Sequence, residues 1–176
     1  PVSTDPPADA STWFADGFEV EGAWPVGDDG LTSAAYDGGW YRLQAHPTDL
    51  PAYRWAANEG TVGSILTVEA HVSFETAGSM AVGLVVADAL DQNRLIVLLE
   101  PGGEWALARD DFESFATLAV GQADPVEVGT VHLLRLSLDG AGSTSAWLDG
   151  RELATAAADL EVARFGVALW SVDEGG

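Results

Sequence analysis

Three closely spaced apolar runs between residues 79 and 110 constrain the fold of this 176-residue chain more than any other feature. They span residues 80–86, 95–99 and 105–107, and in each run apolar side chains recur at every second position, which is the period of a β-strand. The breaks between them contain the Asp, Asn, Pro and Gly residues that favour turns. The sequence therefore predicts an antiparallel meander. Because the middle run is apolar on both faces, we expect it inside a sheet whose outer face is also partly covered.

Similar short segments occur along the rest of the chain. Further strands are expected at residues 18–24, 38–46, 65–74, 112–120, 132–138, 143–148, 151–155 and 165–172, with a turn at 58–60 and at most one helical turn at 156–161. Asp149 and Gly150 form the clearest hairpin signal, since an Asp-Gly pair readily adopts the positive φ angles of a two-residue turn. Ten or more short strands without a long helix predict an all-β, antiparallel two-sheet β-sandwich or jelly roll.

Length and composition fit one folded domain. With 47% hydrophobic residues the chain can bury a core, and it contains no cysteine for a disulfide, a zinc-thiolate site or a catalytic thiol. We assign residues 13–176 to this domain. Residues 1–12 lack an apolar period and are rich in Pro, Asp and Ser, so we interpret them as a linker or a processed N-terminal segment.

The charge balance excludes two classes of partner. There are 28 acidic residues against 7 basic ones, all arginine, which gives a formal net charge of −21. Such a surface repels nucleic acid and anionic lipid, because phosphate binding requires neutralisation by Lys or Arg. No run of about 18 apolar residues is present, so we expect no membrane insertion.

The order of several short motifs resembles that of a known family. The motifs are Asp16-Gly17-Phe18 with Trp24, then residues 39–43, 83–86, 91–99, 132–150 and 165–169. This order is similar to that of concanavalin A-like lectin and glucanase jelly rolls, in particular bacterial laminin-G-like and keto-disaccharide-hydrolase-like modules. The resemblance covers residues 13–172 and implies a concanavalin A-like jelly roll.

The sequence departs from the resembled modules at two places. Ala87 stands where they usually have Arg, and the chain stops at residues 172–176, where they have a further strand. Either the last strand has been cut off or that edge is covered in another way; an uncovered edge could pair with a strand of another chain.

The chain lacks the carboxylate pattern of the glucanases that share this fold. Those enzymes carry Glu-x-Asp-x(-x)-Glu on one strand, and the nearest patterns here, 19–21 and 110–113, are better interpreted as solvated carboxylates. His46, His71 and His132 lie on different expected strands and form no zinc-binding pair. We therefore predict a protein that is not an enzyme, with a keto-disaccharide-type hydrolase as the least favoured alternative.

Acidic loops suggest a cation site. The fold that the chain resembles often carries a structural calcium at loop oxygens, and no other cofactor is expected. The candidate calcium ligands are Asp88, Asp91, Asn93, Asp28 and Asp29. None of these loops matches an EF-hand, and the alternative interpretation is that they are ordinary Asx turns.

Seven tryptophans suggest a binding surface. Trp13, Trp24 and Trp105 are expected in the core. Trp147 and Trp170 fall on the opposite phase from the apolar residues of their strands, so we expect them to point outward and to form one platform. Aromatic rings beside polar groups suit the faces of sugars. The candidate ligand-binding residues are Trp147, Trp170, Arg135, Trp40, Trp55 and Tyr53. The alternative is that a loop or a third layer covers these rings and makes a second small core.

These observations favour a non-catalytic binding or accessory module at the surface of, or outside, a bacterial or archaeal cell. A glycan is the expected ligand. The alternative is a protein-interaction or structural module of a larger surface protein, with another protein as the partner.

Overall fold

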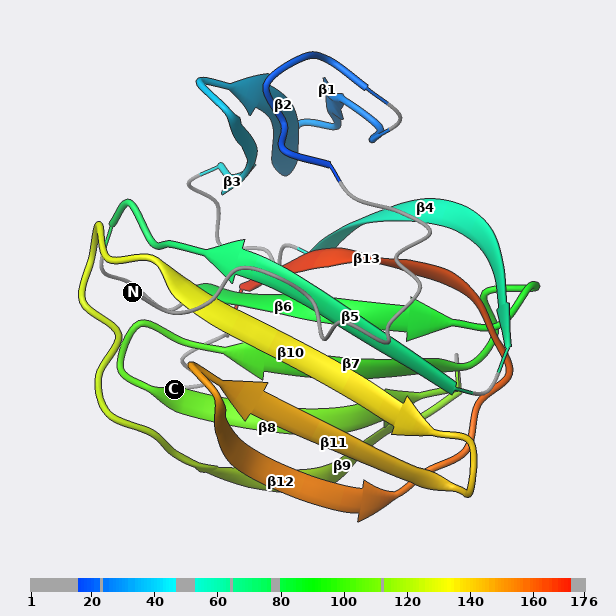
Figure 1. Cartoon of the computed structure of the whole chain (residues 1–176). Coiled ribbons are helices and arrows are strands. Elements are labelled where there is room, and N and C mark those ends of the chain that lie inside the picture. Colours follow the sequence, from blue (N-terminus) through cyan, green and yellow to red (C-terminus); the bar gives the residue numbers. More distant parts are fainter. Residues whose placement is uncertain are drawn as a thin grey trace.

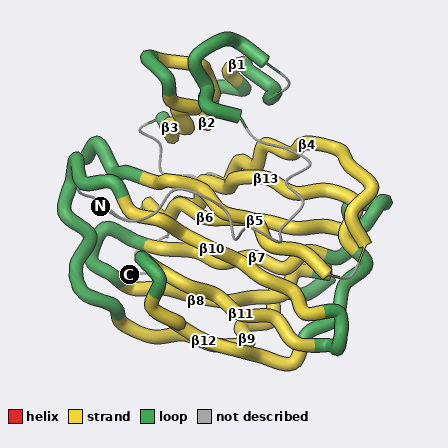
Figure 2. The backbone as a smooth tube through the Cα atoms, in the orientation of Figure 1, coloured by secondary structure: helices red, strands yellow, loops and turns green. Residues whose placement is uncertain are grey.

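The computed structural model describes residues 16–22, 24–46, 53–63, 65–76, 80–111 and 113–171. Within these ranges the chain forms thirteen β-strands and no helix (Figures 1 and 2). No described segment could therefore cross a membrane as a helix. The prediction of an all-β, antiparallel fold is confirmed.

Two sheets face each other as the layers of a sandwich (Figure 1). The larger sheet has the order β4-β13-β6-β7-β8-β9, and its strands are β4 Tyr53–Gly63, β6 Met80–Ala87, β7 Arg94–Leu99, β8 Glu104–Asp110, β9 Phe115–Gln122 and β13 Val162–Ser171. The smaller sheet has the order β12-β11-β10-β5, with β5 Ile65–Val72, β10 His132–Asp139, β11 Ser143–Leu148 and β12 Arg151–Ala157.

A third, three-stranded sheet lies at one end of the sandwich. Its strands are β1 Gly27–Asp28, β2 Thr32–Asp37 and β3 Trp40–Ala45. The rings of Phe18, Trp24, Tyr36 and Tyr41 cluster beside it, with centroids 5.6–6.0 Å apart. Trp24 also meets Phe165 of β13 edge to face, with centroids 6.3 Å apart. Aromatic packing therefore joins the small sheet to the sandwich.

The core lies between the two large layers, and the predicted strand phases are confirmed. Leu84 and Val97 from the larger sheet and Leu136 from the smaller sheet are completely buried in it. The strands β6, β7 and β8 form the expected meander. Ile96 and Leu98 of the middle strand are buried on the opposite face, as expected for a run that is apolar on both sides.

The predicted hairpin at residues 149–150 is confirmed. Asp149 and Gly150 have φ angles of 51° and 80° between β11 and β12, as a two-residue turn of this kind requires. Asp149 also joins the turn to β10: one carboxylate oxygen accepts a hydrogen bond from the backbone N–H of Leu133, and the other lies 2.7 Å from Nδ1 of His132.

Three local predictions are wrong. Residues 18–24 form no strand in the part that the structure describes, and Phe18 has a left-handed φ of 57°, which interrupts an extended chain. The expected turn at 58–60 is part of β4, because pairing with β13 overrides the turn preference of these residues. Residues 156–161 contain no helical turn.

The last strand is not an open edge. β13 lies between β4 and β6 and pairs with both. Among the described strands, the edges are β4 and β9 in the larger sheet and β5 and β12 in the smaller one. Pairing of such an edge with another chain stays a prediction. The expected linker at residues 1–12 and the expected core residue Trp13 lie outside the described residues.

A candidate ligand groove on the outer face of the larger sheet

Small side chains leave space on the outer face of the six-stranded sheet. One row across four strands consists of Ala168, Gly83, Leu98 and Ala106, which are neighbours in the strand register. A Cβ atom at Gly83 would lie 2.2 Å from the carbonyl oxygen of Val97. Glycine is therefore required where β6 and β7 approach so closely, and Leu98 is the only large side chain of this row.

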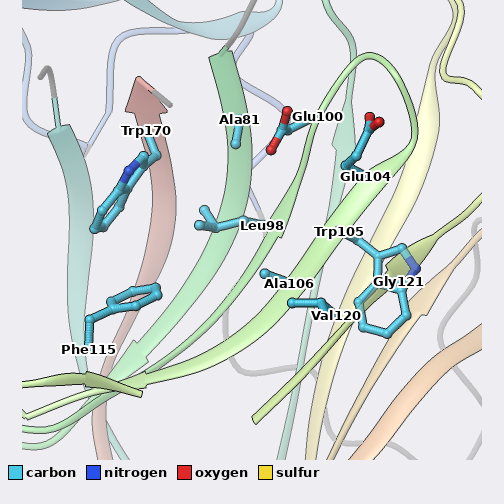
Figure 3. A pocket seen from close by; sticks show the side chains of 10 residues that line it. All are labelled: Ala81, Leu98, Glu100, Glu104, Trp105, Ala106, Phe115, Val120, Gly121 and Trp170. Atoms are coloured by element: carbon cyan, nitrogen blue, oxygen red, sulfur yellow. The ribbon is translucent and has the colours of Figure 1, made fainter. Parts of the chain in front are cut away.

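Two aromatic rings show that this face is concave. Trp170 is on β13 and Phe115 is on β9, with three strands between them. Four interstrand spacings in a flat sheet amount to about 19 Å, yet the ring centroids are 5.2 Å apart. The two side chains therefore lean toward each other over a sheet that curves around them. Figure 3 shows the two rings together on one side of the groove.

The groove between these elements has a volume of about 440 Å³. Its lining is formed by Ala81, Leu98, Glu100, Glu104, Trp105, Ala106, Phe115, Val120, Gly121 and Trp170 (Figure 3). The ring of Trp105 packs against the core, as expected, and against Gly121, where a Cβ would lie 2.4 Å from the ring. The lining is thus mainly apolar, with two carboxylates at one end.

The outer face also carries a second small core. Ala81, Val85, Ile96, Leu98 and Ala168 are buried there, and the half-buried rings of Trp55 and Trp170 pack against them. A second small core is therefore present, and the rings themselves cover it; glycan binding by these rings stays a prediction. The rings cover apolar side chains of the sheet, and part of their surface stays accessible.

An arginine on the same face is held by two carboxylates and a ring. The guanidinium of Arg94 lies 5.3 Å from the ring centroid of Trp55. It donates to both oxygens of Asp91, at 2.8 and 2.9 Å, and to Asp110 at 2.9 Å. The side chain of Arg94 is only 12% exposed. These contacts fix the guanidinium against the sheet.

Glu100 and Glu104 define the acidic end of the groove. Glu100 follows β7 and Glu104 begins β8, and a hydrogen bond of 2.8 Å from the backbone N–H of Glu100 to the carbonyl of Glu104 closes the turn. Burial raises the pKa of Glu100, and the negative charge of Glu104 raises it further. Among the described residues, neither carboxylate has a hydrogen bond or a salt bridge.

The candidate calcium ligands take part in hydrogen bonds of their own loops. Asp88 accepts from the backbone N–H of Leu90 and Gln92 and from the side chain of Asn93; burial raises the pKa of Asp88, but these hydrogen bonds outweigh it and lower the pKa. Both oxygens of Asp91 face Arg94.

The other acidic loop behaves in the same way. Asp28 accepts from the backbone N–H of Gly30, and Asp29 from the N–H and the hydroxyl of Thr32; these hydrogen bonds lower the pKa of both aspartates. In the described ranges no three acidic or histidine side chains are arranged to hold a metal ion. The contacts are those of Asx turns, and calcium binding stays a prediction.

The structure separates the predicted ligand-binding residues into different places. Trp55 and Trp170 are on the outer face of the larger sheet, and Tyr53 pairs with Trp170 in the strand register. Trp147 is on β11 opposite Arg135, on the smaller sheet, where Arg135 forms a salt bridge with Glu69. Trp40 is exposed on β3.

The predicted single platform of Trp147 and Trp170 is therefore wrong. Both side chains point away from the core, as expected, but they lie on opposite outer faces of the sandwich. The chain crosses from the smaller to the larger sheet between β12 and β13, so that nearness in sequence does not bring these rings together.

Sequence reasoning missed Phe115, Glu100 and Glu104 as groove residues. The two glutamates could have been found, since they flank the expected turn between the second and third strands of the meander. Phe115 gave no such signal, because its contact with Trp170 depends on the curvature of the whole sheet.

Two layers of antiparallel strands in this arrangement define a concanavalin A-like jelly roll, as the sequence predicts. No family model and no curated protein sequence matches the chain. Solved structures with this fold are similar to it, among them the carbohydrate-binding module CBM66 from Bacillus subtilis (TM-score 0.57, 15% identity, covering 86% of this chain and 85% of that one).

Two further structures are similar. The Bacillus licheniformis β-glucanase aligns with a TM-score of 0.64 and 9% identity, over 91% of this chain and 85% of its own. The carbohydrate recognition domain of Emp46p aligns with a TM-score of 0.59 and 16% identity, over 89% and 87%. At these identities the likeness establishes the fold alone.

Proposed function

We propose that the chain is a non-catalytic carbohydrate-binding module that acts outside the cytoplasm and binds a glycan in the groove of the larger sheet. The observation that carries this proposal is the pair of Trp170 and Phe115 above a hollow floor of small side chains. A sugar ring presents apolar C–H faces that pack on aromatic rings, and its hydroxyls need polar groups at the margin. Neighbours of the same fold include a carbohydrate-binding module and a carbohydrate recognition domain, which supports the proposal.

The groove favours a glycan over a protein partner. An interaction module would present a flat apolar patch or an open edge strand, whereas here the aromatic rings line a concave groove of about 440 Å³, a volume typical of small-molecule sites. An extracellular or cell-surface location agrees with the secreted nature expected of such modules.

The decisive test compares two tryptophans of similar strand phase on opposite faces. Binding of the parent chain to a glycan array identifies ligands, and calorimetry then gives their affinities. Trp170→Ala should weaken binding at least about tenfold, as expected when a stacking ring contributes 1.4 kcal/mol or more. Trp147→Ala is the matched control and should leave affinity unchanged. An array without any retained glycan, or equal losses in both variants, would contradict the proposal.

Glycoside hydrolysis is a second candidate, favoured by one observation. Glu100, with its raised pKa, lies beside Glu104 in the groove, and a general acid at neutral pH requires a raised carboxyl pKa. β-Glucanases also occur among the proteins of similar fold. Release of reducing ends from a bound glycan, lost in Glu100→Gln, would replace the non-catalytic assignment.

A further inference from the structure

We propose that the groove selects a cationic amino sugar, whose ring packs on Trp170 and whose ammonium group is held by Glu100 and Glu104. This inference rests on the proposed carbohydrate binding and specifies the chemical class of the sugar.

The two carboxylates lie at one end of the aromatic groove. Figure 3 shows Glu100 beside Ala81 and Glu104 on the other side of the turn at residues 101–103 that joins β7 to β8. An ideal Cβ at Gly102 would lie 2.2 Å from Oε2 of Glu104, so the side chain of Glu104 occupies the space that glycine leaves open. The turn thereby sets where the second carboxylate is placed relative to the first.

The charges of this end are not balanced by the chain itself. Within the described ranges the carboxylate of neither glutamate has an ion pair or a hydrogen bond, and the floor beside them is formed by Ala81 and Leu98. Two like charges next to an apolar surface destabilise each other; burial raises the pKa of Glu100 most, and the charge of Glu104 adds to this rise. A cation between them would remove this repulsion and gain two charge-assisted hydrogen bonds.

Other features of the same face disfavour an anionic sugar. Two arginines, Arg94 and Arg164, occupy positions of one register row on this face. Arg94 is engaged by Asp91 and Asp110, and Arg164 also takes part in an interaction within the chain. The whole chain carries a formal net charge of −21. The negative field of the chain repels uronic acids and sulfated sugars, and the arginines of this face are already engaged. A protonated amine is instead attracted by this field.

The apolar part of the groove explains why the cation should belong to a sugar. A simple metal ion would gain nothing from Trp170, Phe115 and Leu98, and the two carboxylates do not form a closed oxygen cage. A pyranose ring with one ammonium group uses both ends of the groove: its C–H face contacts the rings, and its charge reaches the glutamates.

The experiment uses three β-1,4-linked oligosaccharides of equal length, built from glucosamine, N-acetylglucosamine and glucose. They share one backbone and differ only in the group at C2, which is an ammonium, an acetamide or a hydroxyl. Affinities are measured by calorimetry at a mildly acidic pH and at fixed high ionic strength, which screens the general attraction of the acidic surface. We expect the glucosamine oligomer to bind about tenfold tighter than both neutral oligomers, the equivalent of about 1.4 kcal/mol.

Charge-matched variants locate the preference in the groove. Glu100→Gln with Glu104→Gln should remove it, leaving the three affinities within about twofold, roughly 0.4 kcal/mol. Glu127→Gln with Glu161→Gln removes the same charge from exposed positions outside the groove lining and should preserve it. Gly102→Ala keeps both charges but displaces the Glu104 carboxylate, so it should reduce the preference without lowering the melting temperature.

The outcomes separate this inference from the proposed function. Equal affinities for the three oligomers, a preference that survives in the Glu100/Glu104 variant, or retention only of other glycans on the array would overturn the cationic assignment and leave carbohydrate binding intact. If neither the array nor any of the three oligomers gives binding, both proposals fail.

Discussion

The two outer faces of this sandwich differ although side chains alternate between inward and outward positions along the strands of both sheets. On the larger sheet, Val85 and Ile96 point away from the main core and are nevertheless fully buried, beneath side chains that include Trp55 and Trp170. On the smaller sheet, the outward positions carry a salt bridge between Arg135 and Glu69 and are partly open to solvent.

Hydroxyl pairs complete the contrast on the smaller sheet. Thr67 and Ser137 are hydrogen-bonded at 3.0 Å, and Ser145 and Thr155 at 2.7 Å. Such a face is stable in water without a ligand or a covering layer. Period-2 alternation therefore tells which side chains point outward, whereas the chemistry of those side chains decides whether the outward side is a solvated surface or a second core with a groove.

The largest expected effect is a difference in the free energy of unfolding between alanine substitutions on the two outer faces. Ile96→Ala should lower the free energy of unfolding by about 2–5 kcal/mol, as for a residue of the main core, because its side chain is fully buried. Leu136→Ala is the positive control from the main core. Ser145→Ala, on the outer face of the smaller sheet, should cost at most about 1 kcal/mol, one hydrogen bond. Denaturant titrations measure all three, and equal small losses for Ile96→Ala and Ser145→Ala would contradict the second core.

An intermediate effect compares the arginines of the two faces. Arg94→Gln breaks three charge-assisted hydrogen bonds to Asp91 and Asp110 from a side chain that is 12% exposed, so we expect a loss of about 1.5–3 kcal/mol. Arg135→Gln breaks one salt bridge of a side chain that is 35% exposed and should cost about 0–1 kcal/mol. Thermal and chemical unfolding check the order. A loss for Arg135→Gln as large as that for Arg94→Gln would show that the smaller sheet depends on its outer face as much as the larger one does.

The sequence predicted the elements whose conformation depends on residues that are close together in the chain. The meander of β6, β7 and β8 and the hairpin at Asp149-Gly150 follow from alternation and from turn preferences of neighbouring residues. The outward phase of Trp147 and Trp170 was predicted for the same reason.

Features that depend on distant pairing could not be predicted in this way. β4 extends through a turn-like segment because β13 pairs with it, and Phe115 reaches Trp170 because the sheet is curved. The two outward tryptophans are on opposite faces because the chain changes sheets after β12. The alternation of apolar residues predicts none of these three features, because it carries no information on which sheet a strand joins.

The smallest expected effect on stability concerns the glutamates of the two faces, and its sign differs between them. Glu100 in the groove has a pKa raised by burial and by Glu104, so the folded chain favours its protonated form. Its contribution to stability is complete below the unfolded pKa, about 4.3, and is lost as the pH rises through the higher folded value. Glu100→Gln should therefore raise the melting temperature slightly at neutral pH, and this gain should vanish at a pH below about 4.

Replacing Glu69 on the smaller sheet should have the opposite effect on stability at neutral pH. It has Arg135 as its cation, so Glu69→Gln should lower stability by about 0–1 kcal/mol. Glu127→Gln, at an exposed position away from both sites, controls for the general effect of removing one negative charge from a chain of net charge −21. Differential scanning calorimetry at two pH values measures the three variants. A lower melting temperature for Glu100→Gln at neutral pH, after subtraction of this control, would mean that the carboxylates of the groove have a partner and that the groove has no unbalanced charge to offer a cationic ligand.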